Sequence, residues 1–240
     1  MEIPDWVSGF FDDGFEETFR RLGKYDTTDQ DIDDLLRLVH IPPGARILDV
    51  PCGWGRHAGV LDALGYSVVG VDVSEHQVRR ARELWPQISF HETDMRTPPE
   101  GPFDAVINLW TSFGSLPTRS EDLCALGAWR KVLRAGGPLI MELTTVENAK
   151  ATNRIVTASS GRKSVVINGV REDATFDWVR GLSVNTYTRG DWSRTCVTRL
   201  YTRSELHDML QSAGFRDITT YGGFDGAPIT DDRRTVLVAR

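Results

Sequence analysis

Hydrophobic and polar residues follow two different periods along this chain. Between residues 45 and 145, short apolar runs alternate with segments whose apolar residues recur every three or four positions, as in strands followed by helices. The predicted strands are 46–50, 67–71, 88–91, 103–109 and 139–144, and the helices between them are 56–64, 74–85 and a third that begins after Thr118. Strands rich in valine, isoleucine and leucine that alternate with helices predict a parallel, doubly wound sheet.

Three helices in this pattern begin with a capping-box signature, in which a serine or threonine precedes glutamate or glutamine by three positions. The signatures are Ser74-x-x-Gln77, Thr118-x-x-Glu121 and Thr202-x-x-Glu205. The last of these predicts a helix that ends at Gly214, because glycine commonly follows the final helical turn.

The segments on either side of the alternating region have other patterns. Residues 1–40 predict amphipathic helices, with Phe11, Phe15, Phe19 and Leu22 on one face. Residues 150–162 are expected to form a connecting loop. From 163 to 201 the period changes to two, and Asn168-Gly169 predicts a hairpin turn, so this stretch is expected to be a small antiparallel sheet.

The last two predicted strands, 215–221 and 234–239, are joined by a turn-rich segment too short for a crossover helix, so they should pair antiparallel. The fold class expected is therefore α/β, with a doubly wound, seven-stranded, mostly parallel sheet that ends in an antiparallel hairpin. We divide the chain into an N-terminal helical lid (1–44), a core (45–150 and 203–240), and an inserted antiparallel β subdomain (151–202) for substrate binding or oligomerisation.

Composition and charge limit the classes of ligand and partner that this protein is expected to bind. The chain has 240 residues and a net charge of −6, and such an acidic surface repels nucleic acid. Its 3 cysteines are far apart and lack metal-ligand spacing, so we expect no disulfide framework, no metal site and a reducing, cytoplasmic location. The N-terminus lacks the basic region of a signal peptide, and no apolar run is long enough to span a membrane.

The chemistry begins at a glycine-rich loop after the first strand. Gly53-x-Gly55-x-x-Ala58 satisfies the dinucleotide-binding pattern, and Asp72 ends the second strand, where a carboxylate can accept hydrogen bonds from ribose hydroxyls. These features predict a cofactor that contains ribose, but they do not choose which one.

Two acidic positions discriminate between a cofactor with a pyrophosphate and one with an ammonium or sulfonium group. Asp49 precedes the loop, where it would repel a pyrophosphate but would stabilise an ammonium or sulfonium by about a few kcal/mol. Asp94 and Met95 follow the third strand, where a carboxylate can accept the amino hydrogens of adenine and a backbone N–H can donate to a ring nitrogen.

Taken in order, Asp49-x-x-x-Gly53-x-Gly55, Gly70-x-Asp72-x-Ser74 and Asp94-Met95 resemble the motifs of class I S-adenosylmethionine-dependent methyltransferases. The resemblance implies a Rossmann-like methyltransferase fold that binds S-adenosylmethionine or S-adenosylhomocysteine. It also implies roles. The methionine end would meet Tyr25, Asp49, Pro51, Cys52, Gly53, Trp54 and Gly55; the ribose side would meet Asp72, Val73 and Ser74; the adenine would meet Asp94 and Met95; and the sulfonium would lie near Asn108, Leu109 and Trp110. Pro51 departs from the family, in which glycine is commoner.

Methyl transfer is an in-line displacement, so alignment matters more than any single catalytic residue. Glu142 is a candidate base or amine anchor, with a paired structural acid as the alternative, and His57 is a candidate for direct chemistry or for loop packing. Phe113, Tyr187 and Tyr201 are expected to line the substrate cavity, with packing as the alternative.

The insert carries several arginines that could clamp an oxyanion or form a solvated face. The Asn/Asp-Pro-Pro-Phe/Tyr signature, which resembles that of enzymes that methylate nucleic-acid bases or glutamine amides, is missing after the fourth strand. The insert resembles those of small-molecule N- and O-methyltransferases, including enzymes of natural-product biosynthesis. We therefore expect methyl transfer to an N, O or C nucleophile of a small metabolite by a cytoplasmic enzyme, as a homodimer or other oligomer. Three alternatives stay open: a non-methylating displacement or cyclisation with the cofactor as spectator, a catalytically silent subunit, and a nicotinamide enzyme.

Overall fold

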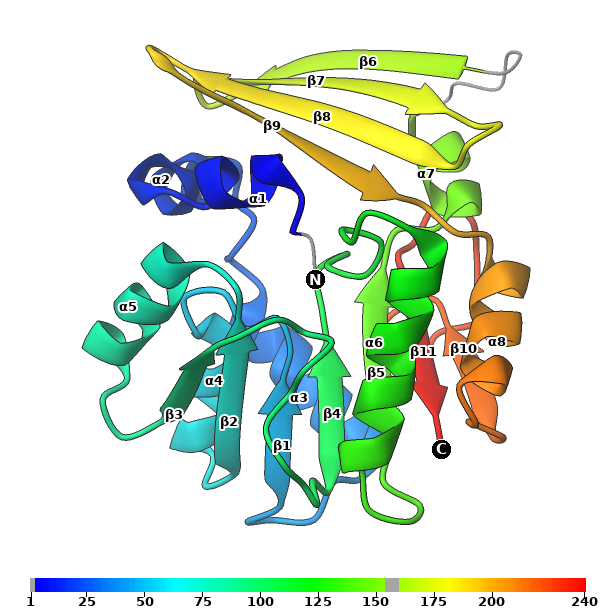
Figure 1. Ribbon diagram of the computed structural model, residues 1–240. Coiled ribbons are helices and arrows are strands. Elements are labelled where there is room, and N and C mark those ends of the chain that lie inside the picture. The colour runs from blue at the N-terminus through cyan, green and yellow to red at the C-terminus, as the bar shows by residue number, and fades with distance from the viewer. Residues whose placement is uncertain (1–2, 154–159) are drawn as a thin grey trace.

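A seven-stranded sheet forms the centre of the computed structural model, which describes residues 3–153 and 160–240 (Figure 1). The strand order is β10-β11-β5-β4-β1-β2-β3. The strands are β1 (Arg46–Asp49), β2 (Ser67–Asp72), β3 (Ser89–Glu92), β4 (Ala105–Asn108), β5 (Leu139–Leu143), β10 (Ile218–Tyr221) and β11 (Thr235–Ala239). Strands β1 to β5 are parallel, whereas β11 runs antiparallel to both β5 and β10, which confirms the predicted fold class.

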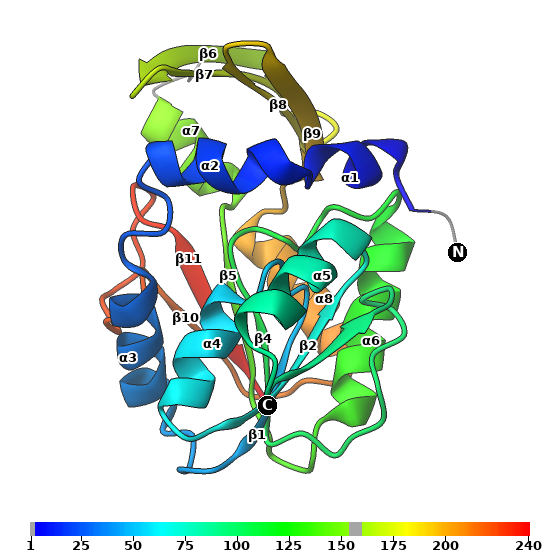
Figure 2. The same cartoon turned by 90° about the vertical axis from the view of Figure 1, so that its left-hand side faces the viewer.

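Helices cover both faces of this sheet (Figure 2). One layer consists of α3 (Thr28–Val39), α4 (Arg56–Ala63) and α5 (Glu75–Leu84), and the other contains α6 (Arg119–Val132) and α8 (Arg203–Ser212). Successive strand residues point to opposite layers: Ile47 packs in the cluster that contains Ile32, and Leu48 in the cluster that contains Trp129. Burial on both faces explains why these strands are almost continuously apolar.

A second, four-stranded antiparallel sheet lies beyond the carboxyl ends of the parallel strands (Figure 1). It consists of β6 (Ser160–Ile167), β7 (Val170–Asp177), β8 (Leu182–Arg189) and β9 (Trp192–Arg199). The predicted hairpin turns at Asn168 and Gly169, whose φ angles are 48° and 76°. Two short helices, α1 (Asp5–Phe10) and α2 (Asp13–Arg21), lie between the two sheets.

The loop expected over 150–162 is replaced by regular structure at both of its ends. Helix α7 (Val146–Asn153) covers its beginning and β6 covers its end, and residues 154–159 lie outside the described part of the chain. Val146 and Ala149 are buried with Ala174 and Phe176 of the second sheet. This burial stabilises a polar segment whose sequence alone gives no strong helical signal, because packing against the rest of the protein supplies most helical stability.

The helix caps follow two of the three predictions completely. Thr118 with Glu121 and Thr202 with Glu205 form reciprocal capping boxes. At α5, Ser74 Oγ accepts the N–H of Gln77, but the Gln77 side chain donates to the carbonyl of Phe11 and so ties α5 to the N-terminal segment.

Two residues predicted to line a substrate cavity belong to the core instead. Phe113 packs between Trp129 and Tyr201, with ring centroids 6.0 and 5.6 Å away. The Tyr201 hydroxyl donates to Asp122 Oδ2 at 2.6 Å, and both partners are buried. Burial raises the pKa of Asp122 to about 6 although the Tyr201 hydrogen bond lowers it. These contacts make Phe113 and Tyr201 packing residues, the alternative that their strand-like pattern left open.

Tyr201→Phe should lower the free energy of unfolding by about 1–3 kcal/mol at pH 8, because a buried carboxylate then loses its donor. Urea denaturation measures this loss. Tyr221→Phe is the matched control and should change stability by less than about 0.5 kcal/mol, since the hydroxyl of Tyr221 makes no hydrogen bond to any described residue. Equal stability of the two variants would contradict the structural role of Tyr201.

Candidate cofactor and substrate site

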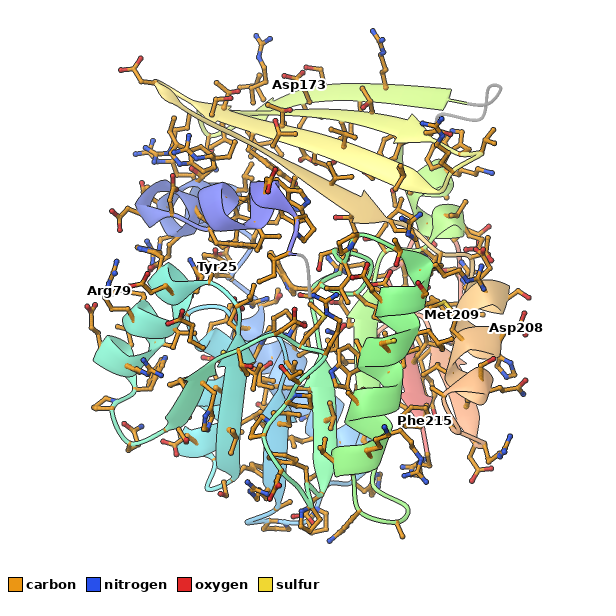
Figure 3. The ribbon with its side chains drawn as sticks, viewed as in Figure 1. Tyr25, Arg79, Asp173, Asp208, Met209 and Phe215 are labelled. Carbon is orange, nitrogen blue, oxygen red and sulfur yellow. The ribbon has the colours of Figure 1, made fainter. Side chains whose placement is uncertain are left out.

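A cavity of about 510 Å³ lies between the carboxyl edge of the large sheet and the second sheet. Its floor is formed by the loop after β1, the residues that follow β2 and β3, and residues 109–112 after β4. Its roof is formed by α1, α2 and one face of the second sheet; Figure 3 shows the side chains that fill this region. Because parallel strands end at one edge, ligands of such sheets bind there.

The loop between β1 and α4 is fixed by the carboxylate of Asp72. The N–H of Gly53 donates to Asp72 Oδ2 at 2.8 Å, and the N–H of Ser74 donates to Oδ1 at 2.9 Å. Gly53 and Gly55 have φ angles of 54° and 80°, which other residues adopt only with strain. Burial raises the pKa of Asp72, while the backbone N–H groups oppose this shift.

Asp49 lies beneath this loop rather than in the cavity wall. Its side chain is completely buried, and neither carboxylate oxygen has a hydrogen-bond partner among the described residues. Burial raises the pKa of Asp49 to about 8, although the nearby Arg56 lowers it. A buried carboxyl without a donor is costly, which makes it a feature that a ligand or a function must explain.

Arg56, the first residue of α4, is a cavity residue that the sequence motifs did not identify. Its Nη1 donates to Thr28 Oγ1 at 2.7 Å, whereas its buried Nη2 has no partner in the described structure. The guanidinium carbon lies 4.3 Å from the ring centroid of Trp110 and 5.3 Å from that of Tyr25. Burial lowers the pKa of Arg56 to about 10, so it is charged at neutral pH.

Asp49 and Arg56 show whether the site can accommodate the methionine end of the expected cofactor. They provide a buried carboxyl and a buried guanidinium, each with unused hydrogen-bonding atoms, on the two sides of one loop. A methionine moiety carries an ammonium and a carboxylate, which need one partner of each kind. The residues present therefore fit the methionine end of S-adenosylmethionine.

Asp94 lines the cavity after β3 and is held by its neighbour. Arg96 donates to Asp94 Oδ1 from Nε at 2.9 Å and to Oδ2 from Nη2 at 2.6 Å. Burial raises the pKa of Asp94, but the hydrogen bonds from Arg96 outweigh it and the net shift is downward. An ionised Asp94 accepts hydrogen bonds only, as an adenine amino group requires.

The chain leaves β4 through a strained turn that Glu142 holds in place. Trp110 and Thr111 both have left-handed φ angles, 68° and 57°. Glu142 Oε2 accepts the N–H of Trp110 at 2.9 Å, its carbonyl accepts the N–H of Thr111 at 3.0 Å, and its Oε1 pairs with Arg234. Both carboxylate oxygens of Glu142 thus have partners, and Glu142 itself does not line the cavity. This favours the paired structural acid over the base or amine anchor. Strain of this kind concentrates at functional sites.

His57 and Tyr187, the first a candidate for direct chemistry or loop packing and the second for the substrate cavity, both line the cavity. Burial, with a smaller effect from Arg56, keeps the pKa of His57 well below its usual value, so the imidazole is neutral and a weak base. The ring of Tyr187, on β8, lies 4.8 Å from that of Phe19. Burial raises the pKa of Tyr187, and its phenol stays protonated.

The predicted cofactor residues divide into a lining set and a supporting set. The lining set is Tyr25, Pro51, Cys52, Gly53, Trp54, Asp72, Val73, Asp94, Met95, Leu109 and Trp110. The supporting set, Asp49, Gly55, Ser74 and Asn108, is buried beneath them. Asn108, for example, donates from Nδ2 to the carbonyl of Val50 at 2.7 Å and so joins β4 to the end of β1.

The roof joins α1, α2 and the second sheet through Asp12. Asp12 Oδ1 accepts the N–H of Gly14 at the start of α2 and the indole N–H of Trp192 at 2.8 Å, and Oδ2 pairs with Arg194 at 2.5 Å. Five aromatic residues of α1, α2 and their linker line the cavity below this contact: Trp6, Phe10, Phe11, Phe15 and Phe19. The N-terminal segment is therefore both a cover of the cavity and part of its apolar wall.

None of the insert's arginines in the described part of the chain lines the cavity, which favours the solvated face over the oxyanion clamp, the two alternatives that the sequence left open. Arg189, Arg194 and Arg199 are held by Thr18, Asp12 and the carbonyl of Pro117, respectively. Polar residues that no motif identified also line the cavity beneath the second sheet, among them Lys24, Lys163, Glu172, Asn185 and Arg234. The sequence indicated a position for Glu172 and Asn185 alone among these residues, because the period of two in β7 and β8 puts both side chains on one face of the second sheet.

Comparisons with known proteins identify the family of this chain. Residues 47–137 match the model of the methyltransferase domain family. The putative methyltransferase YqeM of Bacillus subtilis is 32% identical over 194 residues, 73% of this chain and 75% of that protein. A dTDP-3-amino-3,4,6-trideoxy-alpha-D-glucopyranose N,N-dimethyltransferase of Streptomyces venezuelae is 33% identical over 113 residues, 47% of each chain.

Among solved structures, the S-adenosylmethionine-bound amino pentose methyltransferase of Micromonospora echinaspora superposes with a TM-score of 0.70. It is 24% identical, over 95% of this chain and 96% of that one, and this likeness establishes the fold.

The chain spans about half the length of several curated relatives that it matches. The fold and the site define a nucleoside-binding α/β protein of the methyltransferase type. The chain belongs to the class I S-adenosylmethionine-dependent methyltransferase family.

The burial of Asp49 predicts a pH effect on stability. Its carboxyl keeps a proton in the folded protein up to about pH 8 but loses it near pH 4 when unfolded, so the wild type should lose stability as the pH rises between these values. Asp49→Asn lacks this contribution. Its stability relative to wild type should increase by on the order of 2 kcal/mol between pH 5 and pH 8 in urea denaturation.

The exposed Asp33 on α3 offers the control. Asp33→Asn should follow the pH dependence of the wild type. Parallel pH profiles of Asp49→Asn and wild type would show that burial does not raise the pKa of the Asp49 carboxyl.

Proposed function

We propose that this protein transfers the methyl group of S-adenosylmethionine to a small-molecule acceptor bound beneath α1, α2 and the second sheet. The observation that carries the proposal is the continuity of one cavity, from the Asp72-anchored glycine loop to the aromatic roof. A cofactor on the loop and an acceptor under the roof would then share one enclosed space.

The cofactor end has a residue for each of its polar groups. Arg56 would pair with the carboxylate of the methionine moiety, and Asp49, beneath the loop, would balance the ammonium by giving up its proton when the cofactor binds. Asp72 would accept from the ribose hydroxyls, and Asp94 would accept from the adenine amino group. When bound, the sulfonium supplies an activated methyl group. Tyr25 and Trp54, whose ring centroids are 5.6 Å apart, would cover the methionine end.

The protein would act chiefly by alignment. Trp110, fixed in its left-handed conformation by Glu142, would form the wall beside the reacting atoms, and the rings of α1 and α2 would exclude water. Holding two reactants in line can contribute about 7–11 kcal/mol. His57 lines the cavity and stays a candidate for contact with the acceptor, although its lowered pKa makes the imidazole a weak base.

We propose nitrogen as the acceptor atom, on a small metabolite of a biosynthetic pathway. The name of the Streptomyces relative, an amino-sugar N,N-dimethyltransferase, supports this choice. The alternative of a non-methylating displacement rested on an arginine-rich insert that could hold an anionic leaving group. Because no described arginine of the insert lines the cavity, and Arg189, Arg194 and Arg199 bind other parts of the chain, we favour methyl transfer over that alternative.

Calorimetry with S-adenosylhomocysteine, S-adenosylmethionine and NAD tests the proposal. The first two should bind and NAD should not. Asp72→Asn should weaken S-adenosylhomocysteine at least tenfold, equivalent to about 1.4 kcal/mol, because an amide provides one acceptor oxygen in place of two. The exposed Glu75→Gln on the neighbouring helix is the control and should bind as the wild type. Binding of NAD without binding of either adenosyl compound would refute the proposal.

A further inference from the structure

The acceptor end of the cavity contains three cationic side chains from three distant segments. Lys24 comes from the link between α2 and α3, Lys163 from β6, and Arg234 from the residue before β11. The rest of this end is largely aromatic, with Phe19 and Tyr187 among its walls. A few convergent polar groups in an apolar cavity are the usual means of orienting a ligand.

Two of these cations have acidic partners. Lys163 Nζ lies 3.7 Å from Glu172 Oε1, and the two side chains are 33% and 15% exposed. Arg234 pairs with the buried Glu142, and its Nη2 donates to Thr111 Oγ1 at 2.6 Å. Arg234 is therefore held at the cavity wall beside Trp110, with its guanidinium carbon 5.8 Å from the ring centroid.

Lys24 has no such partner. Its ammonium makes no hydrogen bond and no ion pair with any residue that the structure describes. Lys24 is exposed as a residue but lines the cavity, and desolvation lowers the pKa of its ammonium; Glu172 acts in the opposite direction, and Arg234 and Lys163 lower it further. The other acid that lines this end among the described residues is the exposed Asp232, which accepts a hydrogen bond from Thr230. Lys24 is thus the one cation of the three without an ion-pair partner among the described residues.

We infer that the acceptor substrate carries an oxyanion, a carboxylate or a phosphate, which Lys24 binds beside Arg234, while an aromatic or apolar part of the substrate packs on Phe19 and Tyr187. The inference rests on the proposed function, because it describes the acceptor of that reaction. Glu172 lies opposite Tyr187 on neighbouring strands and would face the amine of the same molecule. The substrate class is then an amine that also bears an oxyanion.

The test uses four phenyl compounds of similar size and different charge: phenyl phosphate, phenylacetate, 2-phenylethanol and 2-phenylethylamine. Each is titrated calorimetrically into the full chain saturated with S-adenosylhomocysteine. At least one anion should bind ten times more tightly than 2-phenylethanol, and raising the salt concentration should weaken it. Phenyl phosphate and phenylacetate separate a phosphate site from a carboxylate site.

Lys24→Met keeps the length of the side chain and removes its charge. It should abolish the preference for the anion while S-adenosylhomocysteine affinity and melting temperature stay within error of the wild type. Lys131→Met, at an exposed position on α6, is the control and should retain the preference.

Two results overturn the inference: 2-phenylethanol or 2-phenylethylamine binding as tightly as both anions, or Lys24→Met retaining the preference for an anion. If S-adenosylhomocysteine binds in the same samples, such a result leaves the proposed function intact. Loss of S-adenosylhomocysteine binding by the wild type instead refutes the proposed function, so the two failures are distinguishable.

Discussion

The hydrogen bond from the N–H of Gly53 to the carboxylate of Asp72 joins the loop after β1 to the end of β2, and the floor of the cavity depends on it. It fixes a loop whose two glycines have left-handed backbones, and the same carboxylate begins α5 by accepting the N–H of Ser74. One buried acid thus sets the relation between two adjacent strand ends. The ligand-binding edge of a parallel sheet becomes a specific site through such cross-links, because the strands themselves only bring the loops together.

The roof has a corresponding centre in Asp12, which caps α2 and binds Trp192 and Arg194 of β9. The N-terminal helices are short and would be marginal alone, so their position depends on the sheet that they contact. This arrangement explains how residues from opposite ends of the sequence line one cavity. It also makes the acceptor pocket a product of both segments, whereas the cofactor end belongs to the parallel sheet.

Uncompensated charge distinguishes the two ends of the cavity. At the cofactor end, Asp49 and Arg56 are buried with unused hydrogen-bonding atoms, and at the acceptor end Lys24 lacks an acidic partner. The two buried groups lower the stability of the protein without ligand, because a desolvated polar group needs a partner, whereas Lys24 is exposed. Proteins retain such groups where a ligand supplies the missing partner, and this is why we propose a zwitterionic cofactor beside an acceptor that carries an anion.

The sequence by itself determined the order of strands and helices, the antiparallel ending and the position of the cofactor residues. Periodicity is a local property, and the ends of parallel strands meet at one edge whatever their loops contain. It did not determine which side chains face the acceptor. Tyr201 and Phe113 have the same pattern as cavity residues but lie in the core, while Lys24, Glu172 and Arg234 come together from three separate segments. An alternating strand shows that one face is polar, but only the packing of distant elements decides whether that face meets solvent or encloses a cavity.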